Sequence, residues 1–431
     1  MKPSHLYALT LSLFIAAVAR SKQQSFSPTN DIFSNHIPDD PVARTIVSRA
    51  LADGIDLAAF AFSGPALQEI VRWSHFEVSS ELPDSLLQNL EGATKIDVHV
   101  HYAPNWYGDI RQDPTEWNLE EHLELMANQS IEESIFSVPN PNIFLGDEGA
   151  TLAIARLLNE NMAALAKALP LRFKFFATIP LPYVHASITE AQYALESLGA
   201  LGVALSSNHE GHYLGDRLFT PFFSALQNTI IFLHPNEPLL EVNKTFVKAN
   251  PTAYSPVIAE FYFETARTIL DLALSQTLTN YTSLDFIMPH LGGAFPAIID
   301  RSMAPGALLD DVMAALRTRC WWDSAGFTYS HQLGGLLAYN ISPSFLLYGS
   351  DYPYISPSLV DASANAMAKS PFLDEEEKQK PNKHLDEGPT KLNQFHMYRA
   401  SMRIPPIFDR RRFFRCFLRC TGFILPLQNT L

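Results

Sequence analysis

The stretch Lys95-Ile96-Asp97-Val98-His99-Val100-His101 decides how the rest of the chain is interpreted. Its polar and apolar residues alternate, which predicts a short β-strand. Side chains at alternate positions of a strand share one face, so His99 and His101 should point the same way. Two imidazoles on one face make half of a metal site. A pair of half-buried histidines on an edge strand is the alternative, and the downstream sequence decides between the two.

Seven further strand-like segments follow and alternate with segments of helical periodicity. We expect these strands at 133–138, 172–179, 201–206, 229–234, 284–290, 320–326 and 345–351. Regular alternation of strands and helices predicts a parallel sheet, and eight strands predict a closed barrel. The expected fold is therefore an α/β protein of the (β/α)₈ TIM type. Functional groups of such a barrel lie where its strands end.

Three more residues meet that criterion. His234 ends the fifth predicted strand, His290 the sixth and Asp351 the eighth. A carboxylate after an apolar strand is costly unless it is paired or bound to a cation. His331, in contrast, begins a predicted helix and is expected to be a capping or surface residue. The convergence of four imidazoles and one carboxylate at strand ends is hard to explain by packing and favours a metal centre.

Composition limits the classes of partner. The 431 residues carry a formal net charge of −14, with 47% hydrophobic and 18% charged residues. Such an acidic globular chain is not expected to bind nucleic acid, because phosphate binding needs a basic surface. A small anionic substrate remains compatible, since a bound metal inverts the local field. Four aromatic residues near strand ends could wall an aromatic ring or could be plain packing. They are Trp106, Tyr107, Trp322 and Tyr352.

The N-terminus has the pattern of a secretory signal peptide. Lys2 precedes an apolar run over 6–19, with the small residues Ala17 and Ala19 at its end. The run is too short to span a membrane. We therefore expect residues 1–19 to be removed in the secretory pathway. A buried N-terminal helix and a cytoplasmic location are the alternatives.

Three segments are expected after the signal peptide. Residues 20–94 should form an N-terminal helical extension, with a helix candidate at 42–62. The barrel is expected at 95–380. Residues 381–431 form an atypical C-terminal tail, whose basic and apolar part at 410–420 could lie on a membrane surface. We favour the alternative that this tail has no packed role, and we expect no stable membrane span.

Several short motifs, in this order and placement, resemble the amidohydrolase superfamily. They are His99-Val-His101, His234-Pro235, His290-Leu-Gly-Gly-Ala-Phe-Pro296 and Gly349-Ser-Asp-Tyr-Pro353. Within it they resemble the aminocarboxymuconate-semialdehyde decarboxylase branch. The stretch Gly199-Ala-Leu-Gly-Val-Ala-Leu-Ser-Ser-Asn208 is similar to that of fungal 6-methylsalicylate decarboxylases. The resemblance runs from about residue 96 to about residue 380.

This resemblance implies a set of site residues. The implied metal ligands are His99, His101, His234 and Asp351. His290 is implied as the acid/base residue beside the metal. Three nitrogens and one oxygen suit Zn²⁺ with a position left open, and Mn²⁺, which some relatives use, is the alternative. Related two-metal enzymes need a bridging lysine at the end of strand four, where this chain has Leu205-Ser-Ser-Asn208, so one metal is expected.

One position departs from the resemblance. Some phenolic-acid decarboxylases carry a glutamate three residues after the strand-six histidine, and Gly293 stands there in this chain. Asp323, at the end of strand seven, is the candidate partner of His290. It could equally cap its own loop.

The function implied is a metal-dependent, non-oxidative decarboxylase of an ortho-hydroxylated aromatic acid such as 6-methylsalicylate. Asp351 or His290 would supply a proton to the ring carbon. A mononuclear hydrolase of the lactonase type is the second hypothesis, and Arg111 and Arg217 are its candidate anion clamp. A secreted binding protein with a degenerate site is the third, disfavoured because each ligand position holds a competent residue. A homodimer is compatible with all three hypotheses.

Overall fold

The computed structural model describes most of the chain between the two terminal segments. The described residues are 37–83, 86, 93–111, 115–138, 143, 146–243, 245–250, 252–303, 307–326 and 330–378. All of them belong to one compact unit that extends to His384. The expected signal peptide at 1–19 and the basic stretch at 410–420 lie outside the described residues and stay predictions. Within the described part, no helix is both long and apolar enough to cross a lipid bilayer.

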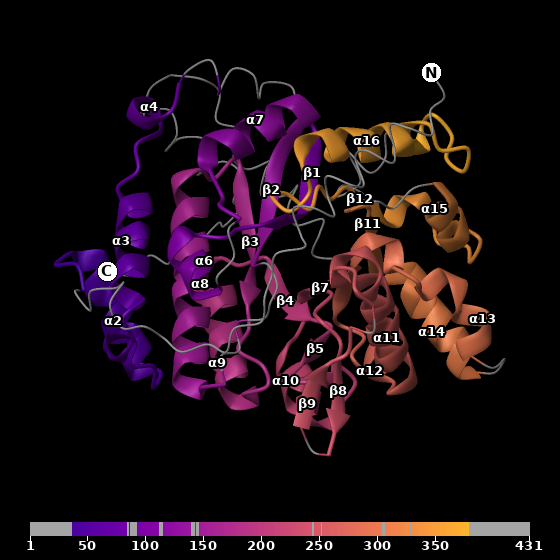
Figure 1. Ribbon diagram of the computed structural model, residues 1–431, viewed down its shortest axis with the longest axis horizontal. Helices are drawn as coiled ribbons and strands as arrows, with labels where there is room; N and C mark the ends of the chain where they lie inside the picture. The colour runs from indigo at the N-terminus through magenta and orange to yellow at the C-terminus, as the bar shows by residue number, and fades with distance from the viewer. Residues whose placement is uncertain are drawn as a thin grey trace, which may run out of the picture. The chain divides into compact units, whose positions relative to one another are not determined.

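Eight parallel strands form the central barrel, in the order β1-β2-β3-β4-β7-β10-β11-β12 (Figure 1). Their bounds are β1 Lys95–His101, β2 Ile131–Ser137, β3 Phe173–Thr178, β4 Gly202–Ser206, β7 Ile230–His234, β10 Asp285–Met288, β11 Cys320–Asp323 and β12 Leu346–Leu347. The last strand closes on the first, because the backbone N–H of Val98 donates to the carbonyl oxygen of Tyr348 at 3.0 Å. The predicted (β/α)₈ barrel is confirmed.

Helices connect successive strands and cover the outside of the barrel (Figure 1). The longest is α8, Glu148–Ala168, whose N-terminus is capped by the Asp147 carboxylate accepting from the backbone N–H of Ala150 at 2.7 Å. The other connecting helices are α6 Asn105–Arg111, α7 Leu119–Gln129, α9 Val184–Tyr193, α10 Thr220–Ala225, α11 Glu260–Leu274, α12 Thr277–Asn280, α13 Ile299–Ser302, α14 Ala307–Thr318, α15 Ser330–Leu337 and α16 Pro357–Ala368. His331 is exposed in the first turn of α15, as expected.

The sequence missed two short hairpins. β5 (Asn208–His209) pairs with β6 (His212–Tyr213), and β8 (Leu239–Val242) pairs with β9 (Thr245–Lys248). The first hairpin follows β4 directly, so it lies at the barrel end where functional groups are expected. The strands of the first hairpin have two residues each and those of the second have four, which is too short for a clear pattern of alternation.

The described part of the N-terminal extension contains several helices rather than the one predicted. The predicted helix at 42–62 ends early: α2 spans Pro41–Ala52, and Gly54 follows with a φ of +83°. A second helix, α3 (Ser63–Ser74), packs along α8, and residues of α2, α3 and α8 share an apolar cluster (Figure 1). A third, α4, is the short Val78–Glu81. The extension therefore adds a second core beside the barrel.

Polar contacts also tie this extension to the strand that carries the histidine pair. The hydroxyl of Tyr102, which directly follows β1, lies 2.9 Å from a carboxylate oxygen of Glu69 on α3. It also lies 2.7 Å from the amide oxygen of Asn161, and the indole N–H of Trp73 donates to it at 3.3 Å. Burial raises the pKa of Glu69. These groups fix the carboxyl end of β1 from outside the barrel.

Candidate metal centre

Four side chains from two strands and the segment after a third converge at one end of the barrel. The ligand atoms of His99, His101, His234 and Asp351 all lie within 4.8 Å of one another. The Nε2 atom of His101 is 3.2 Å from Oδ1 of Asp351, and the Nε2 atom of His99 is 3.7 Å from the same oxygen. The structure thus brings together all four residues that the sequence predicted as ligands.

This donor set fits one divalent metal ion. The Nε2 atom of His99 is buried and has no hydrogen-bond partner among the described residues. A buried polar atom without a partner is costly, and a cation held by the four donors would satisfy it. Three imidazole nitrogens and one carboxylate oxygen leave a coordination position for water or substrate. β4 ends at Ser206 without a lysine, which accords with a single metal.

The electrostatics of three ligands, Asp351, His101 and His234, favour the protonation states that bind a metal, whereas His99 has a raised pKa and must lose a proton to bind. Burial raises the pKa of Asp351, but hydrogen bonds from His101 and His290 hold it well below its ordinary value. Burial lowers the pKa of His101. Burial, followed by the charges of His101 and His99, brings the pKa of His234 well below its usual range. An ionised carboxylate beside neutral imidazoles is the form that coordinates a divalent ion.

Each ligand histidine has a partner at Nδ1 that fixes its ring and leaves Nε2 for the metal. The pairs are His99 with Oδ2 of Asp323 at 3.0 Å, His101 with Oγ of Ser137 at 3.2 Å, and His234 with the carbonyl oxygen of Pro235 at 2.9 Å. The first two partners come from β11 and β2, so the barrel itself sets the orientation of the imidazoles.

Of the two predictions for Asp323, the pairing with the His290 imidazole is wrong and the capping of its own loop is confirmed. Its carboxylate is fully buried, and its Oδ1 accepts from the backbone N–H groups of His290 and Ala325, both at 3.0 Å. Its Oδ2 pairs with the ring of His99. The Nδ1 atom of His290 has no hydrogen-bond partner among the described residues. Asp323 therefore supports a metal ligand and the backbone of His290, and does not pair with the His290 imidazole.

His290 and Asp351 both leave extended geometry after their strands, with φ angles of 53° and 60°. Residues other than glycine adopt this left-handed region at a cost, which surrounding contacts must sustain. The side-chain amide of Gln332 donates to the carbonyl oxygen of His290. The backbone N–H of Asp351 donates to the carbonyl oxygen of His99 at 2.8 Å. These turns bring Nε2 of His290 to 3.7 Å from Oδ2 of Asp351.

The four aromatic residues near strand ends pack in apolar surroundings. Trp106 and Tyr107 lie in the cluster that joins the extension to α8. Trp322 stacks on Phe295, with ring planes 12° apart and ring centroids 6.5 Å apart. The ring centroid of Tyr352 lies 5.0 Å from that of His122. All four side chains therefore match the alternative that they serve packing. The ring beside His290 is instead that of Tyr262, stacked with centroids at 5.5 Å.

The two candidate arginines lie in different surroundings. Arg111 Nη1 donates to the hydroxyl of Tyr354 at 3.2 Å, and the Tyr354 ring lies 5.5 Å from that of His101. Arg217 is exposed in the 3₁₀ turn Arg217–Phe219. Only Arg111 stands near the metal ligands, so the structure does not assemble the paired clamp that the lactonase hypothesis needs.

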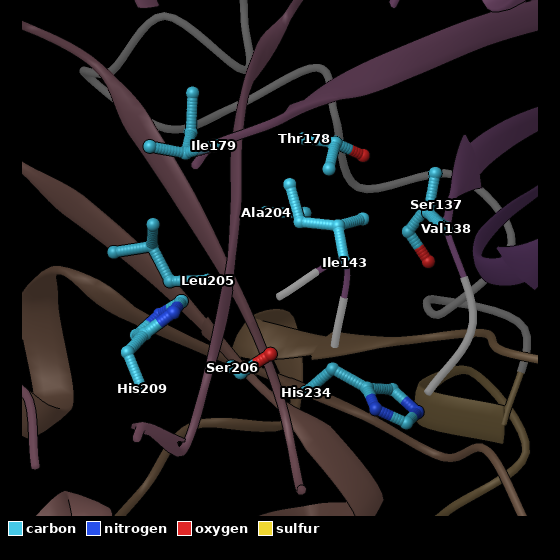
Figure 2. A pocket seen from close by; sticks show the side chains of 10 residues that line it. All are labelled: Ser137, Val138, Ile143, Thr178, Ile179, Ala204, Leu205, Ser206, His209 and His234. Carbon is cyan, nitrogen blue, oxygen red and sulfur yellow. The ribbon is translucent and has the colours of Figure 1, made fainter. Parts of the chain in front are cut away.

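A pocket adjoins the ligands (Figure 2). One end is formed by the ligand His234 and by Ser137, the partner of His101. The lining residues are Ser137, Val138, Ile143, Thr178, Ile179, Ala204, Leu205, Ser206, His209 and His234.

Sequence reasoning missed the polar part of this pocket. Ser137, Thr178 and Ser206 are the last residues of β2, β3 and β4, so the strand-end criterion could have selected them. They escaped because only residues typical of metal ligands were weighed. His209 lies in the hairpin after β4, and burial lowers its pKa to about 3, which a hydrogen bond to the backbone of Leu181 only partly offsets. Its imidazole is therefore neutral at physiological pH.

A sequence model of the amidohydrolase family matches residues 96–380. The chain belongs to the amidohydrolase family. Among curated relatives, decarboxylase yanB of Aspergillus niger is 30% identical to this amidohydrolase over 300 residues, which cover 63% of this chain and 81% of the relative. A 6-methylsalicylic acid decarboxylase of Penicillium expansum is 30% identical over 286 residues, which cover 60% and 85%. The resemblance expected from the motifs is confirmed.

Solved structures agree on the fold. A dihydroxybenzoic acid decarboxylase of a Polaromonas species, with bound manganese, matches the amidohydrolase with a TM-score of 0.58 at 18% identity. The match covers 70% of this chain and 98% of that one. At this identity the likeness shows the barrel architecture. The helices α2 and α3 precede the residues that the family model matches.

Proposed function

We propose that this amidohydrolase is a metal-dependent, non-oxidative decarboxylase that releases CO₂ from an ortho-hydroxylated aromatic acid. One observation carries the proposal. In the cluster of three histidines and one aspartate, Nε2 of His290 lies 3.7 Å from Oδ2 of the ligand Asp351. Two fungal relatives of this chain are named as decarboxylases, and one of them acts on 6-methylsalicylic acid. That acid is the first candidate substrate.

The bound metal would supply Lewis-acid chemistry and a template for the carboxylate and the neighbouring hydroxyl of the substrate. The reaction also needs a proton at the ring carbon that bears the carboxylate, so that CO₂ can leave. We propose that His290 or Asp351 supplies it, since Nε2 of His290 lies 3.7 Å from Oδ2 of Asp351. Asp351, which is ionised in the site, would first take this proton from the ortho hydroxyl of the substrate. The contacts that sustain the left-handed backbone at both residues, from Gln332 and from His99, hold them in this orientation.

Zn²⁺ is the metal that we propose, with Mn²⁺ as the alternative. Three nitrogen donors and one oxygen donor in a buried site are typical of zinc. Mn²⁺ also accepts nitrogen and oxygen ligands, and it is the ion named with the Polaromonas structure. Metal analysis of protein purified without added metal, followed by reloading with each ion, would separate the two.

The central experiment offers hydroxybenzoates to the metal-loaded protein and measures CO₂. Ortho-hydroxy acids should react, and meta-hydroxy isomers should bind but turn over poorly, mainly through a lower kcat. His99→Ala should lose both metal and activity, whereas His331→Ala, an exposed residue of α15, should keep both. Hydrolysis of lactones without CO₂ from any aromatic acid would transfer the assignment to a mononuclear hydrolase.

We further propose that residues 1–19 direct the chain into the secretory pathway. Support comes from the sequence pattern around Lys2 and Ala19. Sequencing the N-terminus of the mature protein tests it, and an intact N-terminus on cytosolic material would overturn it.

We also propose a homodimer, supported by three exposed apolar side chains that are close in sequence: Val257 and Ile258 in the 3₁₀ turn Pro256–Ile258, and Phe263 in the first turn of α11. Light scattering should report twice the mass of one chain. The mass of a single chain at micromolar concentration would overturn the proposal.

A further inference from the structure

Four short motifs of the sequence have no role in the proposed reaction. Each has the pattern Asn-x-Ser/Thr with a residue other than proline in the middle, which is the acceptor pattern for an N-linked oligosaccharide in the secretory pathway. The motifs are Asn128-Gln-Ser130, Asn243-Lys-Thr245, Asn280-Tyr-Thr282 and Asn340-Ile-Ser342. A fifth triplet, Asn250-Pro-Thr252, has proline in the middle and does not match. Such triplets are common by chance, and the fold decides whether these asparagines can carry a glycan.

All four acceptor asparagines lie on the surface. They are exposed, and so is the serine or threonine two positions after each of them. Four other asparagines of the barrel are buried, and none of these begins an acceptor motif: Asn159, Asn161, Asn208 and Asn236. A glycan is bulky and hydrated, so only an exposed asparagine can hold one without opening the core. The fold therefore accommodates a glycan at each of the four motifs.

Three of the motifs contain a left-handed residue of a surface turn. Asn243 lies in the turn between β8 and β9 with a φ of 52°, and Asn340 lies in the turn after α15 with a φ of 59°. Ser130 ends α7 with a φ of 56°. Residues of this conformation occur at hairpin turns and helix ends, where the chain reverses direction. Figure 1 shows the β8–β9 hairpin projecting at the lower edge of the view.

Three of the motifs also share one end of the barrel, because each lies between a helix and the strand that follows it. Asn128 is in the last turn of α7, before β2. Asn280 ends α12, before β10, and Asn340 lies between α15 and β12. In a parallel barrel, connections from a helix to the next strand lie at the amino ends of the strands. The metal ligands lie at or after the carboxyl ends, so these three motifs lie on the opposite face.

The first strand gives the distance between the two faces. The backbone N–H of Lys95, the first residue of β1, donates to the carbonyl oxygen of Ser130 at 3.0 Å. The ligand His101 is the last residue of β1. A strand rises about 3.3 Å per residue, so His101 lies about 20 Å from Lys95. A glycan on Asn128 therefore extends from the far face of the barrel and stays clear of the metal ligands.

We propose that Asn128, Asn243, Asn280 and Asn340 are N-glycosylation sites of this chain. The side-chain amide nitrogen of each asparagine forms a bond to C1 of an oligosaccharide carried by a lipid diphosphate, and the bond from C1 to the phosphate oxygen breaks. The amide loses one proton and the lipid diphosphate leaves. This inference rests on the proposed secretory entry at residues 1–19 and does not depend on the decarboxylase reaction.

The test uses the full chain, with its own N-terminus, produced in a eukaryotic host that secretes glycoproteins. Peptide N-glycosidase hydrolyses the bond between asparagine and sugar and leaves aspartate. When this step is done in water labelled with heavy oxygen, mass spectrometry of the peptides identifies each former glycan site. All four asparagines should appear as labelled aspartate, and Asn250 should remain asparagine. An unlabelled asparagine at one motif overturns the inference for that position, and four unlabelled asparagines overturn it entirely.

Two substitutions at Thr282 provide a matched pair. Thr282 is exposed, so neither substitution disturbs the core. Thr282→Ala removes the hydroxyl that the acceptor pattern needs while Asn280 stays in place, and the protein should lose the mass of one glycan. Thr282→Ser keeps the hydroxyl and should keep the mass of the wild type. Equal masses of the two variants would contradict glycosylation at Asn280.

Two further measurements separate this inference from the proposals beside it. If the N-terminus is processed and all four asparagines are unmodified, secretory entry stands and glycosylation is wrong. If the N-terminus is intact on cytosolic material, secretory entry and glycosylation are both wrong. Metal content should be the same before and after the glycans are removed from the folded protein, because three motifs lie on the face opposite the ligands. Loss of the metal would overturn the placement of the glycans away from the site.

Discussion

Replacing Asp323 by asparagine should weaken metal binding while preserving the shape of the site. The wild-type carboxylate pairs with the ring of His99 and accepts from the backbone N–H groups of His290 and Ala325, all at 3.0 Å. Asparagine has one oxygen and one NH₂ group. If its oxygen faces the backbone N–H groups, its NH₂ group opposes Nδ1–H of His99, and the reverse orientation opposes the backbone instead. Either way, donors face each other in a fully buried site.

The size of the effect follows from these contacts. Leaving a buried donor without its acceptor costs about 1–3 kcal/mol. Changing the group that orients a metal-bound histidine typically lowers metal affinity by about 10- to 100-fold, or roughly 1.4–2.7 kcal/mol. The two figures agree because both describe the same lost contact at His99. We therefore expect Asp323→Asn to bind the metal about 10- to 100-fold more weakly than the wild type.

Competition with a chelator of known affinity, at about pH 8 so that protons do not compete, measures this change. Asp285→Asn is the matched control, because Asp285 is a mostly buried carboxylate at the opposite end of a neighbouring strand, β10. Its metal affinity should equal that of the wild type. If Asp323→Asn binds the metal as tightly as the wild type, Asp323 does not support His99 and the reasoning is refuted.

Three further outcomes can be checked. Burial lowers the pKa of His99, but the charges of Asp323 and Asp351 more than offset this effect, so the net pKa of His99 is raised. A metal ion must displace the proton of His99 to bind. The metal content after dialysis should therefore fall as the pH drops through the pKa of His99. Unchanged retention at acidic pH would contradict this. His290→Asn should keep the metal and lower kcat by about 10²–10⁴-fold; wild-type kcat would remove His290 from proton transfer. Tyr102→Phe should lower the free energy of unfolding by about 1–3 kcal/mol in urea titration, and an unaltered midpoint would show that its polar contacts are neutral.

Most of the barrel could be predicted because its strands are apolar runs separated by helices of clear periodicity. The ends of three strands could not. The predicted strand at 320–326 stops at Asp323. The predicted strand at 284–290 stops at Met288, since Pro289 and the left-handed His290 follow. The predicted strand at 345–351 keeps Leu346–Leu347 in the ladder and Tyr348 as a single bridge to β1, because the chain then turns and brings Asp351 to the other three ligands. Propensity alone does not reveal backbone that is strained at a functional site.

The ligand residues could be predicted because each comes at the end of, or soon after, a strand and is a residue type that binds metals. Their partners could not. Ser137 and Asp323 are ordinary residue types, and their roles depend on which strands are neighbours in space: Asp323 is 224 positions from His99. Such information exists only once the strands are arranged.

The contacts of Tyr102 have a consequence for how the enzyme fails under heat. Tyr102 follows the ligand His101 and is held by Glu69 and Trp73 of α3, which lies ahead of the residues that the family model matches. Outer elements generally open at lower free energy than a barrel core. When α3 detaches, the end of β1 loses its outer support, and His101 with it. Catalysis should then cease at a temperature below the melting point of the barrel, so that heat inactivation would begin as the loss of an ion and not as unfolding.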